Sequence, residues 1–154
     1  MKTVVLGLGN TLLCDDGVGI YALNQLQKNW QGESTVEFID GGTLSFTLTE
    51  VLYHADNLIV IDAAQLSSTP GKVKVFTNEA MDDFVSNGKC SSVHEVSLAE
   101  LLDMARLLDS LPGRRALIGV QPEKVDWADQ PTNAVLDSIP LVCREATTLL
   151  EAWH

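Results

Sequence analysis

Short, continuously apolar runs alternate along this chain with longer segments that carry apolar side chains at helical spacing. Apolar runs of about four to eight residues are typical of strands that are buried in a parallel sheet. The pattern predicts strands at Thr3–Leu8, Thr35–Ile39, Leu58–Ile61 and Ala116–Val120. It predicts helices at Gly17–Trp30, Phe46–Tyr53, Val93–Leu108 and Pro131–Ala152. Pro140 should kink the last helix or divide it in two, because proline interrupts the helical hydrogen bonds.

Strands that alternate with helices are joined by right-handed crossovers, which give a mostly parallel sheet with helices on both faces. The segment Gly71–Thr77 instead alternates valines with more polar side chains, which predicts a half-exposed edge strand that we expect to be antiparallel. We therefore predict a three-layer α/β fold that forms a single domain over residues 1–154. In such open sheets, ligands bind beyond the carboxyl ends of the strands.

Composition restricts the partners and the compartment. The formal net charge is −11, which would repel nucleic acid and anionic membranes and favour a partner with a basic segment. No signal-peptide pattern precedes the first strand, and no apolar run approaches the roughly 20 residues that span a bilayer. The cysteines, Cys14, Cys90 and Cys143, lack CxxC spacing, which indicates reduced thiols. We expect a cytoplasmic protein without membrane insertion.

Three polar positions are expected at the carboxyl edge of this sheet. Asp16 lies in the loop after the first strand, and Asp62 directly follows the apolar run of the third strand. His94 lies in a segment with capping-box spacing, in which Ser92 would be the N-cap and Glu95 its partner. Because crossover helices begin at the carboxyl edge of a parallel sheet, we expect His94 to face the same crevice as the two aspartates.

These side chains would supply two carboxylates and one imidazole, a donor set that suits a divalent ion such as nickel or zinc. The positive end of a helix would also favour the neutral imidazole that a metal requires. From the residues alone, structural roles stay open as well. Asp16 could favour a helix start, Asp62 could be a hydrogen-bonded strand end, and His94 could be a surface histidine. Glu95 is better explained as part of a capping box than as a general base.

Two familiar protease arrangements do not fit the chain. His94-Glu95 is not followed by a second histidine at the required spacing, so a zincin helix is excluded. Cys14 directly precedes two aspartates, whose charge would disfavour a thiolate. A cysteine nucleophile paired with His94 is therefore a poor interpretation.

A dinucleotide-binding protein is an alternative. Gly7-Leu8-Gly9 follows a strand, and Asp40 ends the next one, as in the Rossmann fingerprint. However, Leu12 stands where the fingerprint requires a third glycine, and the loop carries Asp15 and Asp16, which would repel a pyrophosphate. We expect no nucleotide cofactor.

The segment Gly7–Gly19, GLGNTLLCDDGVG, resembles the opening motif of the hydrogenase maturation proteases, G-x-G-N-x-L-x-x-D-(D/E)-G-x-G. The segment Asp40–Thr43 is similar to the D-x-G-T loop of that family. Ser92-x-His94 and Gly119–Pro122, the latter similar to G-x-Q-P, follow in the family's order. The resemblance therefore covers nearly the whole chain.

The resemblance implies a five-stranded twisted sheet and an endopeptidase that removes the C-terminal extension of a nickel–iron hydrogenase large-subunit precursor after nickel insertion. It implies Asp16, Asp62 and His94 as nickel ligands, with Asp16 or Asp62 as the catalytic base, and Asp40, Gly41, Gly42 and Thr43 as substrate-binding residues. The nickel could belong to the precursor and mark the bond to be cut, or it could itself activate the carbonyl or water. A nickel or hydrogenase chaperone without proteolytic activity is a further alternative.

Overall fold

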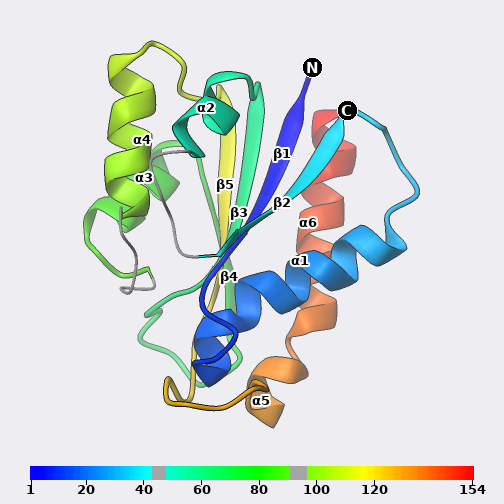
Figure 1. Ribbon diagram of the computed structural model, residues 1–154, viewed down its shortest axis with the longest axis vertical. Helices are drawn as coiled ribbons and strands as arrows, with labels where there is room; N and C mark the ends of the chain where they lie inside the picture. The colour runs from blue at the N-terminus through cyan, green and yellow to red at the C-terminus, as the bar shows by residue number, and fades with distance from the viewer. Residues whose placement is uncertain (43–47, 91–96) are drawn as a thin grey trace.

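The computed structural model describes residues 1–42, 48–90 and 97–154 (Figure 1). Its strands are β1 (Thr3–Leu8), β2 (Val36–Gly42), β3 (Asn57–Ala63), β4 (Val73–Thr77) and β5 (Arg114–Val120). They form a five-stranded sheet in the order β2-β1-β3-β5-β4. β4 is the antiparallel edge strand, and every other pairing is parallel. The predicted α/β sheet with one antiparallel edge strand is confirmed.

Helices cover both faces of the sheet, as Figure 1 shows. On one face lie α1 (Val18–Asn29) and α6 (Ile139–Trp153), and the short α5 (Asn133–Leu136) adds to the same core. On the other face lie α2 (Leu48–Tyr53), α3 (Glu79–Ser86) and α4 (Leu98–Leu107). Within the described ranges, no helix is both long enough and apolar enough to span a membrane.

The sequence of β3 is continuously apolar because both faces of the strand are buried. Successive side chains of a strand point to opposite faces, so Ile59 and Ile61 join the core under α1 and α6, whereas Leu58 and Val60 join the core under α4. All of them are fully buried. Each such side chain contributes about 1.5–3 kcal/mol of burial free energy, so both layers depend on this central strand.

The last predicted helix is divided in two, which confirms one of the two outcomes expected from Pro140. α5 ends at Leu136 and α6 begins at Ile139, with Pro140 in its first turn. Proline is tolerated there because the first N–H groups of a helix have no intrahelical partner.

The helices differ from the prediction in two places. The sequence pattern did not identify α3, although its buried Met81 and Val85 have helical spacing. α4 begins at Leu98 and not near Val93, and its N-cap is Ser97, whose Oγ accepts a hydrogen bond of 3.1 Å from the Glu100 N–H. The capping box predicted for Ser92 and Glu95 lies outside the described residues.

Candidate active site

In and directly after the loop that follows β1, the backbone passes very close to neighbouring segments at two glycines. Gly9 has a φ of +127°, and a Cβ atom there would lie 1.9 Å from the carbonyl oxygen of Asp16. A Cβ atom at Gly19 would lie 2.2 Å from the carbonyl oxygen of Ile61 in β3. Only glycine fits at these two positions, and together they hold the 3₁₀ turn η1 (Cys14–Gly17) and the start of α1 against the central strands.

Asp16 lies in η1 and is 4% exposed. Its Oδ2 accepts a hydrogen bond of 3.0 Å from the backbone N–H of Asn10. α1 begins two residues later, with Gly17 as its N-cap and without a capping side chain. The carboxylate therefore closes its own loop directly before the N-cap of α1, where a negative charge also favours the helix start.

Asp62 lies inside β3 and is completely buried. The sequence pattern places Asp62 directly after the third strand, whereas the structure places it inside β3, so the predicted end of that strand was wrong. The strand continues because Asp62 pairs with Gly119 and Ala63 with Val120 of β5. The Asp62 Oδ1 accepts a hydrogen bond of 2.8 Å from the Ala63 N–H.

Asp16 and Asp62 come from neighbouring elements at the carboxyl edge of the sheet, because η1 packs against β3. Cys90 lies at the same edge, where it forms an antiparallel bridge with Ala64. Burial and the negative charge of Asp62 raise the pKa of the Cys90 thiol to about 12. The predicted third ligand, His94, lies outside the described residues.

The Asp40–Gly42 segment lies beside this edge, and it belongs to a strand instead of the loop that the resemblance implied. β2 continues through Gly42, and the ladder with β1 shifts register between Gly7 and Leu8. The Asp40 Oδ1 accepts a hydrogen bond of 2.9 Å from the Gly42 N–H, and the Gly42 carbonyl oxygen accepts one of 3.0 Å from Gly9. Gly41 lies within the same strand, and Thr43 lies outside the described residues.

Asp15 is a structural residue that sequence reasoning missed. Its completely buried carboxylate accepts hydrogen bonds from the backbone N–H groups of Glu123, Lys124 and Thr132, and from the Thr132 hydroxyl. Burial acts to raise the pKa of Asp15, but these hydrogen bonds outweigh it and hold the pKa below its ordinary value. Asp15 thereby fastens the 121–132 loop to the loop that carries Asp16, and Figure 1 shows the two segments side by side.

Replacing Asp15 by asparagine should lower the free energy of unfolding by about 2–4 kcal/mol at pH 7, because an amide cannot accept all of these hydrogen bonds. The stabilisation by Asp15 is complete above the unfolded pKa of about 3.9 and is lost as the pH falls through the lower folded pKa. Urea unfolding at pH 7 and at pH 3 should therefore show a difference between the two proteins that shrinks in acid. The exposed Asp83→Asn is the control, and an equal effect of both variants would contradict the assignment.

The structure also accounts for the alternatives that the sequence disfavoured. Burial, and then the charge of Asp15, raise the pKa of the Cys14 thiol, which makes Cys14 unsuitable as a nucleophile. In the supposed dinucleotide loop, the N–H of Gly9 donates to Gly42 and that of Asn10 donates to Asp16. These N–H groups are therefore used within the protein, where a pyrophosphate site would need them available.

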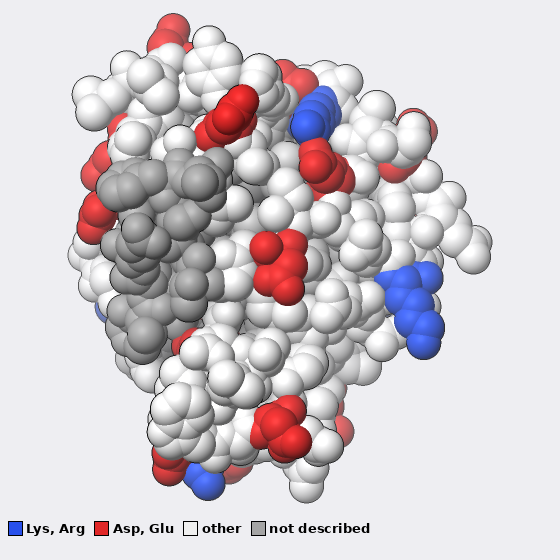
Figure 2. Space-filling model, viewed as in Figure 1, with Lys and Arg blue, Asp and Glu red and all other residues white. Residues whose placement is uncertain are grey.

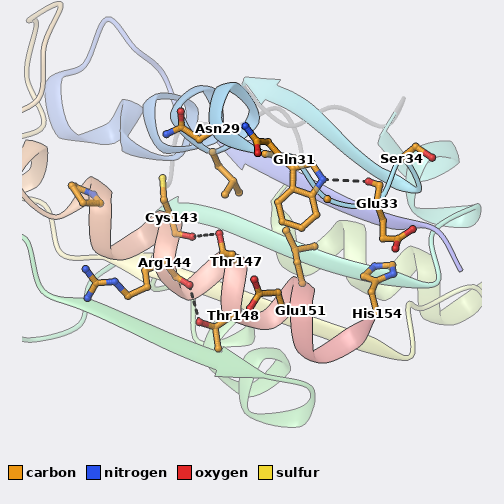
Figure 3. A pocket seen from close by; sticks show the side chains of 15 residues that line it. Asn29, Gln31, Glu33, Ser34, Cys143, Arg144, Thr147, Thr148, Glu151 and His154 are labelled. Atoms are coloured by element: carbon orange, nitrogen blue, oxygen red, sulfur yellow. Dashed lines mark hydrogen bonds between the residues drawn. The ribbon is translucent and has the colours of Figure 1, made fainter.

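A large groove of about 1260 Å³ lies elsewhere, between the C-terminal part of α1 and α6 (Figure 3). It is lined by Trp30, Cys143 and Thr147, among others. Asp16 precedes α1, whereas this groove begins at its last turns, and a helix of 12 residues is about 18 Å long. The groove is therefore separate from the aspartates.

Within the described ranges, no group of three or more histidine, cysteine, aspartate or glutamate side chains is placed to hold a metal ion. Asp16 and Asp62 nevertheless supply two buried carboxylates at one edge, and carboxylate oxygen is a donor that divalent ions accept. The two described members of the predicted ligand set thus fit a metal in their chemistry. A third ligand at His94 stays a prediction.

The reported comparisons with known proteins all find hydrogenase maturation proteins. A family model described as hydrogenase maturation protease matches residues 20–149. The hydrogenase expression/formation protein HupD of Rhizobium leguminosarum bv. viciae is 33% identical over 153 residues, which cover 99% of this chain and 75% of that protein. The hydrogenase 2 maturation protease of Escherichia coli K12 is 31% identical over 127 residues, covering 82% of this chain and 76% of that protein.

A solved structure shares the fold over almost the entire chain. The hydrogenase maturating endopeptidase HybD from Escherichia coli superposes with a TM-score of 0.91 at 27% sequence identity. The match covers 99% of this chain and 93% of that structure. None of these matches supports the dinucleotide-binding alternative.

Proposed function

The chain belongs to the hydrogenase maturation protease family, and from that premise we propose that it removes the C-terminal extension of a nickel–iron hydrogenase large-subunit precursor once nickel is in place. Membership makes the chain an endopeptidase that processes a hydrogenase precursor. The observation that carries the proposal is the pair of buried carboxylates, Asp16 and Asp62, at the edge of the sheet where such folds bind their ligands.

The two carboxylates suit peptide hydrolysis. A water molecule must lose a proton as it attacks the scissile carbonyl, and a carboxylate within hydrogen-bonding distance can accept that proton. Asp16 is 4% and Asp62 0% exposed, and electrostatic interactions of buried groups are stronger than those at the surface. We assign the role of general base to one of these two residues.

Nickel enters this proposal as part of the substrate. Asp16, Asp62 and His94 would contact the nickel that the precursor already holds, and this contact would place the scissile bond next to the base. Asp40, Gly41, Gly42 and Thr43 would position the C-terminal extension. The precursor large subunit is the partner, and no nucleotide is required.

The charge of the chain favours a partner that presents a basic segment. Figure 2 shows acidic side chains spread over one face of the molecule, with few basic ones among them. With a net charge of −11, the long-range field would speed the approach of a basic surface and would weaken as salt is added.

Incubation of the purified protein with nickel-loaded and nickel-free precursor tests the proposal, with the mass of the large subunit as the readout. We expect the mass to fall only for the nickel-loaded precursor, and we expect the protein itself to be nearly metal-free. Equal cleavage of both precursors would contradict nickel recognition. An unchanged mass in both, despite binding, would favour the chaperone alternative, and tightly bound stoichiometric nickel would show that nickel is a resident cofactor.

A further inference from the structure

An exposed apolar patch lies on the 121–132 loop and on the loop after β1. It consists of Leu12, Val125 and Trp127, whose side chains are 57%, 51% and 75% exposed, and we call it the Trp127 patch. Trp127 is the most exposed aromatic residue among the described residues. Large apolar side chains that gather on the surface mark interaction sites more often than isolated ones do.

The backbone beneath the Trp127 patch is held in place. The Ala128 N–H donates to the Leu12 carbonyl oxygen at 3.0 Å, and the Cys14 N–H donates to the Ala128 carbonyl oxygen at 3.1 Å. The Tyr21 hydroxyl donates to the Asp129 carbonyl oxygen at 2.8 Å. Together with the hydrogen bonds to buried Asp15, these contacts fix the backbone of the loop that carries Trp127. Because the backbone of this loop is already ordered, little conformational entropy is lost when a partner binds Trp127, which favours affinity.

The Trp127 patch shares a loop with the candidate active site. The Leu12 N–H donates to the Asn10 Oδ1 at 2.9 Å, and the Asn10 N–H donates to the Asp16 Oδ2 at 3.0 Å. The loop that exposes Leu12 is thus the loop that positions Asp16. A polypeptide whose scissile bond reaches Asp16 therefore approaches the loop that carries part of this patch.

The charged side chains around the patch restrict the kind of partner surface that can bind there. Glu123, Asp126 and Asp129 are exposed on the same loop, and Lys124 is its one basic residue. A second copy of this chain would place these acidic groups against one another, and like charges across an interface are unfavourable. A surface with an apolar pocket bordered by lysine or arginine is complementary.

We propose that the Trp127 patch is the docking surface for the folded body of the hydrogenase precursor, whose contact region has an apolar pocket with a basic rim. Trp127 inserts into that pocket, and the acidic side chains of the loop contact the rim. This inference rests on the proposed function, because the precursor is the partner that must come to Asp16. Aromatic side chains near the centre of an interface account for much of its binding free energy.

Trp127→Ser tests the proposal in steady-state cleavage of nickel-loaded precursor. We expect KM to rise at least about 10-fold, the loss typical of an aromatic anchor, with kcat within about twofold of the wild type. The matched control is Leu107→Ser, which removes an 86% exposed apolar side chain at the C-terminal end of α4. Val125→Ser should raise KM in the same direction, and added salt should raise the KM of the wild type.

Several results would overturn the proposal. An unchanged KM for Trp127→Ser, or an equal rise for Leu107→Ser, would exclude docking at this patch. A fall in kcat alone would place Trp127 in the chemistry, and wild-type dimers that Trp127→Ser dissociates would assign the patch to self-association. Failure of the proposed function gives a different result from failure of docking, because the wild type would then leave the precursor mass unchanged. In that event, direct binding of the precursor to both proteins still tests docking.

Discussion

Asp62→Asn is expected to leave the nickel-loaded precursor at its full mass, with processing slowed by about 10²–10⁴-fold, the range for the loss of a catalytic acid–base group. The thermal midpoint should not fall. Asp62 is completely buried in the central strand, and asparagine has nearly the same shape and keeps an oxygen that can accept the hydrogen bond from the Ala63 N–H.

The measurement is the mass of the large subunit over time, together with a thermal unfolding curve of each variant. Asp103→Asn, an exposed aspartate of α4, is the matched control and should process at the wild-type rate. Asp16→Asn should lose activity in the same way as Asp62→Asn. Full activity of either site variant would remove that residue from the proposed mechanism.

Gly9→Ala should have the largest effect on stability, with a loss of about 3–5 kcal/mol in the free energy of unfolding. Gly9 has a φ of +127°, which residues with a Cβ rarely adopt. A Cβ atom would also lie 1.9 Å from the Asp16 carbonyl oxygen, so the loop would have to move. Because the same loop positions Asp16, activity should fall as well.

Urea denaturation measures this effect as a lower midpoint at an unchanged slope. Gly113→Ala is the matched control, since φ is not positive there and a Cβ atom would meet nothing within 4 Å. That variant should be as stable as the wild type or slightly more stable, because alanine reduces the entropy of the unfolded chain. Equal midpoints for the two variants would show that the loop can relax around an added methyl group.

The strands of the parallel sheet were predictable because their signal is local. The run Thr3–Leu8 is the strand that the structure shows, and the other apolar runs differ from their strands only at the ends. The strand ends were wrong where pairing continued beyond the apolar residues, as at Gly42 and Ala63. Hydrogen bonding to a neighbouring strand decides where a strand ends, and the neighbour is distant in sequence.

Asp16 and Asp62 were proposed as site residues from their positions after predicted strands. Their burial was not foreseen, because it depends on η1 packing against β3. Asp15 shows most clearly what could not be predicted from the sequence. It is adjacent to Asp16 in sequence, but its partner Thr132 is 117 residues away, and no local pattern distinguishes the two carboxylates.

The sequence by itself determined the α/β class, the edge at which its polar residues gather and, through motifs spread over the chain, the family. Periodicity and short motifs are local properties, so they can be read without coordinates. Only the tertiary structure decided that Asp15 holds two loops together, that Asp62 is completely buried, and that Trp127 is exposed on the loop that is hydrogen-bonded to Asp15. Burial and hydrogen bonding between loops arise when segments more than a hundred residues apart are brought together, and that depends on the folded chain.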